Sequence, residues 1–102
     1  MLLVSYGFDV HWNDPLGSLL LSADGYARMI ASLADFANQH CQGRIAVFLE
    51  GGYDQEAGKA CTNALVAALL GEPWSDPLGP APFPESSTWQ GMVKEAKILW
   101  GL

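Results

Sequence analysis

Basic residues are scarce in this chain. Its 102 residues include five lysines and arginines against eleven aspartates and glutamates, a formal net charge of −6. Clustered cationic side chains bind phosphate backbones, so the composition argues against a nucleic-acid partner. No apolar run is long enough to cross a bilayer, and no basic segment precedes the opening Met-Leu-Leu-Val. We therefore expect no membrane partner and a soluble, cytoplasmic protein.

Cysteines are also few. Cys41 and Cys61 lie in separate helical patterns, without CxxC spacing. This argues against a disulfide framework and favours a reducing compartment, and we expect both thiols to be small buried hydrophobes. The chain also lacks a GxSxG elbow, an HExxH helix, a P-loop and a GxGxxG fingerprint. A nucleotide-binding module is therefore a distant alternative.

Apolar residues, by contrast, make up half of the chain, which is enough for one packed domain over residues 1–102. Leu2–Tyr6 is a short apolar run without alternation, which predicts a strand buried on both faces. Arg44–Leu49, "RIAVFL", predicts a second buried strand. Between them, Ser22 is a suitable N-cap for a helix that ends near Cys41. The apolar stripe of this helix, which we expect in the core, contains Tyr26, Met29, Ile30, Leu33, Phe36 and Ala37.

A second helix is predicted from about Gln55 to Leu70, because Gly71 is a typical helix-ending residue and Pro73 prevents continuation. Residues 72–85 hold five of the six prolines and form either an extended arm that is ordered by contact or a linker. A closing helix is expected over 87–100, and its apolar stripe contains Trp89, Met92, Val93, Ala96 and Leu99. We expect Met92 of this stripe to lie in the core.

The order of these elements predicts an α/β fold. A strand, a helix and a second strand form a right-handed βαβ unit with parallel strands. The carboxyl ends of such strands meet at one edge of the sheet, where open α/β sheets bind ligands. We therefore expect the loops at 7–17 and 50–54 to be neighbours.

The first of these loops is rich in side chains that bind metals. Asp9, His11 and Asp14 all offer ligand chemistry suited to zinc. A complete local three-ligand site is one interpretation. The more ordinary one is that Asp14 caps the turn at Pro15, while His11 lies at the surface or behind a ligand.

The second loop begins with a glycine pair. Gly51 and Gly52 follow a buried strand directly, which allows positive φ or a close approach of another group to the backbone. The ordinary interpretation of such a pair is a simple turn. Tyr53 follows at the mouth of the strand. Its hydroxyl can serve as an oxyanion donor, or it can be an amphipathic residue at the rim.

Two motifs together carry a resemblance. "VSYGFDVHWNDPLGSLLLS", followed by Gly25-Tyr26 and then by "GRIAVFLEGGYD", resembles the C-terminal part of the zinc-dependent histone deacetylase superfamily. The similarity is strongest to the bacterial branch, with acetoin-utilisation proteins and acetylpolyamine amidohydrolases. It extends through "ALLGE", "DPLGPAP" and the closing helix.

The resemblance implies an arginase-like α/β fold with a parallel sheet, and a zinc ion held by two aspartates and one histidine. Asp9 resembles the second of those aspartate ligands. Tyr53 resembles the tyrosine that polarises the amide carbonyl, and Gly51 and Gly52 match glycines that line the substrate channel. His11 does not match the family's Asp-x-His ligand pair, which belongs to an earlier segment with different flanks.

The other metal ligands and the paired catalytic histidines of the family also come earlier than these motifs, and this chain has no counterpart of them. We therefore expect one side of a zinc deacetylase site, acting on acetylated lysine or acetylated amines and inactive as an isolated chain. The alternative is a truncated, non-catalytic remnant that serves as a binding or self-associating α/β module. Either way, we expect a homo-oligomer or association with a missing N-terminal part, and no tightly bound zinc.

Overall fold

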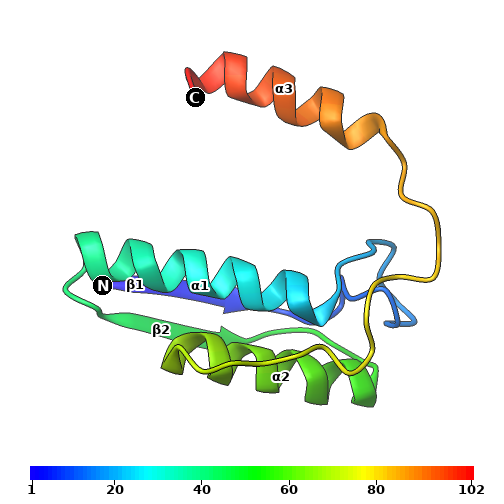
Figure 1. The fold of residues 1–102 in the computed structure, drawn as a ribbon, viewed down its shortest axis with the longest axis horizontal. Coiled ribbons are helices and arrows are strands. Elements are labelled where there is room, and N and C mark those ends of the chain that lie inside the picture. Colours follow the sequence, from blue (N-terminus) through cyan, green and yellow to red (C-terminus); the bar gives the residue numbers. More distant parts are fainter.

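The computed structural model describes residues 1–102. Strands β1 (Leu2–Tyr6) and β2 (Ile45–Leu49) form a two-stranded parallel sheet, in which Leu2 pairs with Ile45 and Tyr6 with Leu49. Helix α1 (Ala23–His40) connects them, so the predicted βαβ unit is confirmed (Figure 1). The expected α/β fold class is therefore correct.

Local sequence signals set the helix ends. The Ser22 hydroxyl accepts a hydrogen bond from the Gly25 N–H and caps α1, as predicted. Helix α2 (Gln55–Leu70) has the predicted bounds and ends at Gly71, whose φ of 69° is left-handed. Its N-cap is Asp54, whose carboxylate accepts from the Ala57 N–H at 2.7 Å. This cap was not predicted from the sequence.

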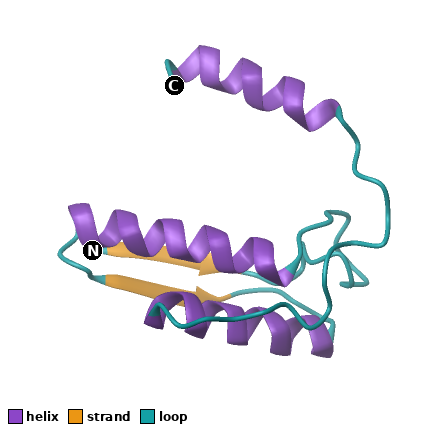
Figure 2. Ribbon diagram, viewed as in Figure 1, coloured by secondary structure: helices purple, strands orange, loops and turns teal.

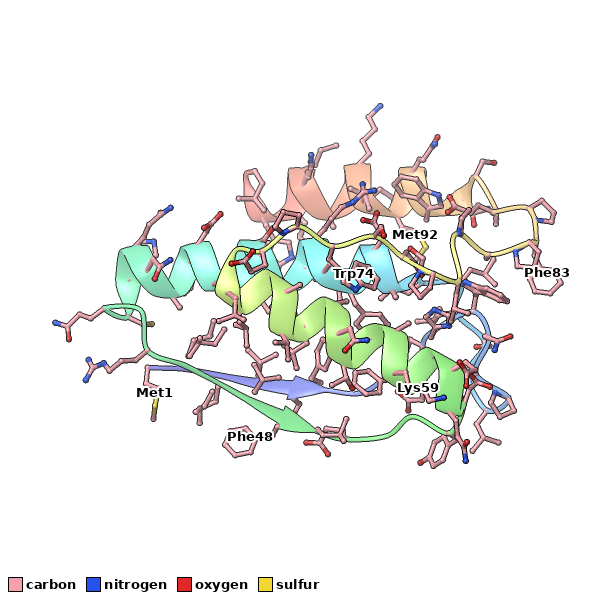
Figure 3. The ribbon with its side chains drawn as sticks, turned by 60° about the horizontal axis from the view of Figure 1, so that its bottom comes forward. Met1, Phe48, Lys59, Trp74, Phe83 and Met92 are labelled. Carbon is pink, nitrogen blue, oxygen red and sulfur yellow. The ribbon has the colours of Figure 1, made fainter.

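The core lies between the sheet and helices α1 and α2, which pack against each other over one face of the strands (Figure 3). Tyr6, Phe8 and Tyr26 meet there in edge-to-face contacts, with ring centroids 5.1–6.1 Å apart. Cys61 is fully buried beside them, and burial raises the pKa of its thiol to about 12. The predicted buried hydrophobe is confirmed for Cys61, whereas Cys41 is only half-buried.

The opposite face of the sheet is open, so the prediction of strands buried on both faces is wrong. Leu3 is 60% exposed and Phe48 is 56% exposed, and Phe48 points away from the two helices (Figure 3). The apolar sequence of a strand fits a covered sheet, but nothing in this chain covers this face. Met29 and Phe36 of the α1 stripe were expected in the core. Both are about half exposed, because no other element of this chain covers them.

Helix α3 (Thr88–Trp100) stands apart from the rest of the chain (Figure 2). Residues 72–85 first run back along α2 and then lead to α3 (Figure 1). None of the residues of α3 is buried, so the expected core position of Met92 is wrong. Ser87 occupies the N-cap position without a side-chain cap hydrogen bond. None of the three helices combines the length and the hydropathy that a bilayer span requires.

Candidate functional site

The loops that follow the two strands meet at one edge of the sheet, as predicted (Figure 1). The Phe8 N–H donates to the Gly51 carbonyl at 2.7 Å, and the Glu50 N–H donates to the Tyr6 carbonyl at 3.0 Å. The Tyr26 hydroxyl donates to the Gly7 carbonyl at 2.7 Å and fixes the first loop from α1. The backbone around Asp9 is therefore held from two directions.

Asp9 and Tyr53 converge on Gly51. A β-carbon placed on Gly51 would lie 2.8 Å from Asp9 Oδ2 and 3.5 Å from Tyr53 Oη. A β-carbon on Gly7 would lie 2.8 Å from Asp9 Oδ1. These glycines therefore make room for the carboxylate from both sides. Tyr53 is 61% exposed, and neither functional group is engaged in a hydrogen bond within the chain.

Gly52 combines both features that the glycine pair predicted. Its φ is 141°, which is unfavourable for residues with a side chain. A β-carbon there would also lie 2.7 Å from Phe8 Cβ and 3.3 Å from Phe8 Cα. The second loop can therefore press directly against the first.

His11 is fully buried, so of its two predicted positions, at the surface or behind a ligand, the surface position is wrong. Its Nδ1 accepts from the Asn13 N–H at 3.1 Å, whereas its Nε2 is buried without a partner. Burial lowers the pKa of His11, and the charges of Asp76, Asp54 and Asp14 oppose this only in part. No three His, Cys, Asp or Glu side chains of this chain lie close enough together to hold a metal ion, so the local Asp9–His11–Asp14 site does not form.

Asp14 has a larger role than the predicted turn cap. Its Oδ1 accepts from the N–H groups of Leu16 and Gly17, at 2.9 and 3.3 Å, which confirms the cap. Its Oδ2 accepts from the N–H groups of Tyr53 and Asp54, at 2.7 and 3.2 Å. Burial raises the pKa of Asp14, but these four hydrogen bonds outweigh it and hold the pKa below its usual value.

The same four-residue motif occurs a second time. Asp14-Pro15-Leu16-Gly17 recurs as Asp76-Pro77-Leu78-Gly79 in the proline-rich arm. Asp76 Oδ1 accepts from the N–H groups of Leu78 and Gly79, and its Oδ2 accepts from the Asp24 N–H at 3.0 Å. Neither carboxylate was predicted from the sequence to connect two segments. The repeated motif is the signal that could have found them.

The second motif also ties the arm to the first loop. The Trp12 indole N–H donates to the Gly79 carbonyl at 3.0 Å. Trp74 and Leu78 of the arm pack against the core cluster. This part of the arm is therefore ordered by contact, which was one of the two predicted alternatives.

Comparison with known proteins identifies the class. The family model described as "Histone deacetylase domain" matches residues 1–69, so the chain belongs to the histone deacetylase domain family. The suspected resemblance and the arginase/deacetylase fold are confirmed.

Individual relatives support this membership. The chain is 42% identical over 71 residues to a "Probable deacetylase" of Archaeoglobus fulgidus, covering 69% of this chain and 20% of that protein. It is 36% identical over 99 residues to "Histone deacetylase 6" of Caenorhabditis elegans, covering 96% and 10%. The structure titled "Crystal Structure of HDA15 HD domain" matches with a TM-score of 0.65 and 35% identity, covering 90% of this chain and 24% of that one. The chain thus spans a fifth or less of the length of these two curated relatives and corresponds to part of a deacetylase.

Proposed function

We propose that this segment supplies one side of the active site of a zinc-dependent deacetylase that hydrolyses acetylated lysine or acetylated amines. The observation that carries the proposal is the convergence of the Asp9 carboxylate and the Tyr53 hydroxyl on Gly51, from two different loops. A carboxylate is a suitable zinc ligand, and a phenolic O–H is a suitable oxyanion donor. The names of the relatives support the reaction class.

In this proposal each residue has a separate role. Asp9 would supply one ligand to the ion, and Tyr53 would donate a hydrogen bond to the carbonyl oxygen as it gains negative charge. Gly51 and Gly52 would line the substrate channel, as their match to the family's channel glycines implies. Gly51 also leaves room for the Asp9 carboxylate, and Gly52 lets the second loop pack against Phe8. Zinc, when bound, polarises the carbonyl and activates water.

The other ligands and the general base come from outside this segment. The Nδ1 of His11 is occupied, and its imidazole is fully buried. His40 lies in the last turn of α1, with its ring centroid 4.6 Å from that of Phe36. We therefore assign neither histidine as the general base.

The first test uses the chain alone. A structural or catalytic zinc site in proteins has three or four protein ligands, and Asp9 supplies one. We expect weak zinc binding in equilibrium dialysis and no hydrolysis of an acetyl-lysine reporter. Tight stoichiometric zinc together with turnover would contradict the proposal.

The second test uses the zinc-loaded domain that includes the remaining ligands. Asp9→Ala should lower zinc occupancy, whereas Tyr53→Phe should keep the zinc and reduce turnover by about 10²–10³-fold. Asp35→Ala is the control, because Asp35 is exposed on α1. Full activity of the Phe variant would remove Tyr53 from the mechanism.

A non-catalytic binding module is the second candidate. The observation that favours it is the large uncovered apolar surface, which includes the open sheet face and α3. An apolar groove of about 680 Å³ also lies along β1 and α1, lined by Val4, Val10, Tyr26, Met29, Leu33 and Phe36 among others. Exposed apolar surface of this kind is typical of an interface. Its partner would be either the rest of the domain or a second copy of this chain.

A further inference from the structure

We propose that Asp14 is a positioning residue that sets Tyr53 at its place beside Asp9. This inference rests on the proposed function, because it assigns Asp14 a role toward the proposed oxyanion donor. Asp14 is five residues after Asp9 in the same loop, and its carboxylate binds the backbone N–H of Tyr53 itself. The proposed ligand and the proposed donor are thus joined through one side chain.

The two oxygens of Asp14 have separate partners. Oδ1 closes the turn of its own loop, through Leu16 and Gly17. Oδ2 receives the N–H groups of Tyr53 and Asp54 from the other loop. With only 6% of Asp14 exposed, water has little access to replace either pair. Two N–H groups donate to each of the two carboxylate oxygens. A carboxylate accepts at both oxygens, whereas the side-chain amide of asparagine has only one acceptor oxygen.

The hold on Tyr53 extends into α2. Asp54, whose N–H also binds Asp14, caps α2 through its own carboxylate. The Asp54 carbonyl in turn accepts from the Gly58 N–H at 2.9 Å. Tyr53 is therefore fixed between the first loop on one side and a helix start on the other. Its side chain is exposed, so its direction depends on this backbone anchoring.

Asp76 provides a matched control within the same molecule. It is followed by the same Pro-Leu-Gly and closes the same turn, but its other oxygen accepts from the Asp24 N–H at the start of α1. Asp76→Asn should loosen a comparable bridge without releasing the backbone of Tyr53.

The test compares Asp14→Asn with Asp76→Asn in the ¹⁵N-labelled 102-residue chain. Loss of a hydrogen bond to a charged acceptor should speed amide hydrogen exchange at Tyr53 and Asp54 by about 10–100-fold. Exchange at these two amides should not change in Asp76→Asn. If the Tyr53 and Asp54 amides each exchange at the same rate in Asp14→Asn as in the wild type, the proposal is overturned.

Two further measurements keep the result decisive. If Asp14→Asn does not fold, the wild type decides: the Tyr53 amide should exchange at least about tenfold more slowly than that of Gly52, which donates no hydrogen bond in the structure, and equal rates overturn the proposal. In the zinc-loaded domain, Asp14→Asn should lower kcat more than it changes KM and keep the zinc. An unchanged kcat would overturn the positioning role. Full activity of Tyr53→Phe would instead refute the proposed function, while the exchange data still judge the contact itself.

Discussion

Two identical substitutions, six positions apart, should change stability in opposite directions. Gly52→Ala places a methyl group at a φ of 141°, and such backbone strain costs about 1–3 kcal/mol. The new β-carbon would also lie 2.7 Å from Phe8 Cβ. Overpacking of this kind costs about 1–3 kcal/mol more. Gly52→Ala should therefore lower the free energy of unfolding by about 2–6 kcal/mol. A typical domain has a free energy of unfolding of about 5–15 kcal/mol, so this is a large part of it.

Gly58→Ala is the matched control. Gly58 lies in the first turns of α2, and a β-carbon there meets Phe8 at 3.9 Å, an ordinary contact. Alanine should stabilise the helix by about 0.5–1 kcal/mol.

Urea unfolding followed by circular dichroism separates the two variants. With a slope of about 2 kcal/mol per M, Gly52→Ala should lower the midpoint by about 1–3 M, and Gly58→Ala should raise it by about 0.3–0.5 M. A Gly52→Ala midpoint within about 0.3 M of the wild type, at an unchanged slope, would refute the strain argument.

Two other predictions concern pH and association. Burial lowers the pKa of His11, so the unfolded chain takes up a proton more readily. The contribution of neutral His11 to the free energy of unfolding should be complete above pH about 6.5 and should be lost as the pH falls below that value. This loss of stability should persist in His40→Gln and should be smaller in His11→Gln. The chain should also self-associate through α3, whose Met92 and Leu99 are 69% and 80% exposed. Sedimentation should therefore depend on concentration, and less so in a Met92→Lys/Leu99→Lys variant; a single monomeric species at every concentration would contradict this.

Several features of the fold could be predicted because their causes are local. Leu2–Tyr6 is an apolar run that ends at Gly7, and α2 ends at a glycine that adopts the left-handed conformation. The meeting of the two loops also follows from the sequence, because the handedness of a βαβ unit leaves little choice. Asp9 and Tyr53 could therefore be placed on one edge without coordinates.

Burial could not be predicted in the same way. An apolar stripe indicates which face of a helix or strand is suited to a core, but a second element has to cover that face. Phe36 and Leu3 satisfy the pattern and are still exposed, because neither α2 nor α3 covers them. The same pattern is what makes α1 and α3 candidates for association.

The two Asp-Pro-Leu-Gly motifs mark the limit of local reasoning most clearly. Both carboxylates close the turn that their own sequence predicts, since the accepted N–H groups lie two and three residues ahead. The sequence around each aspartate does not specify a partner for its second carboxylate oxygen. In Asp14 it reaches 39 residues along the chain to Tyr53, and in Asp76 it reaches back 52 residues to Asp24. The same three following residues thus lead to different partners, because the packing of loops and helices decides which free N–H groups lie within reach. A repeated motif can reveal that such a carboxylate has a free oxygen, and only the fold identifies the Tyr53 backbone as its partner.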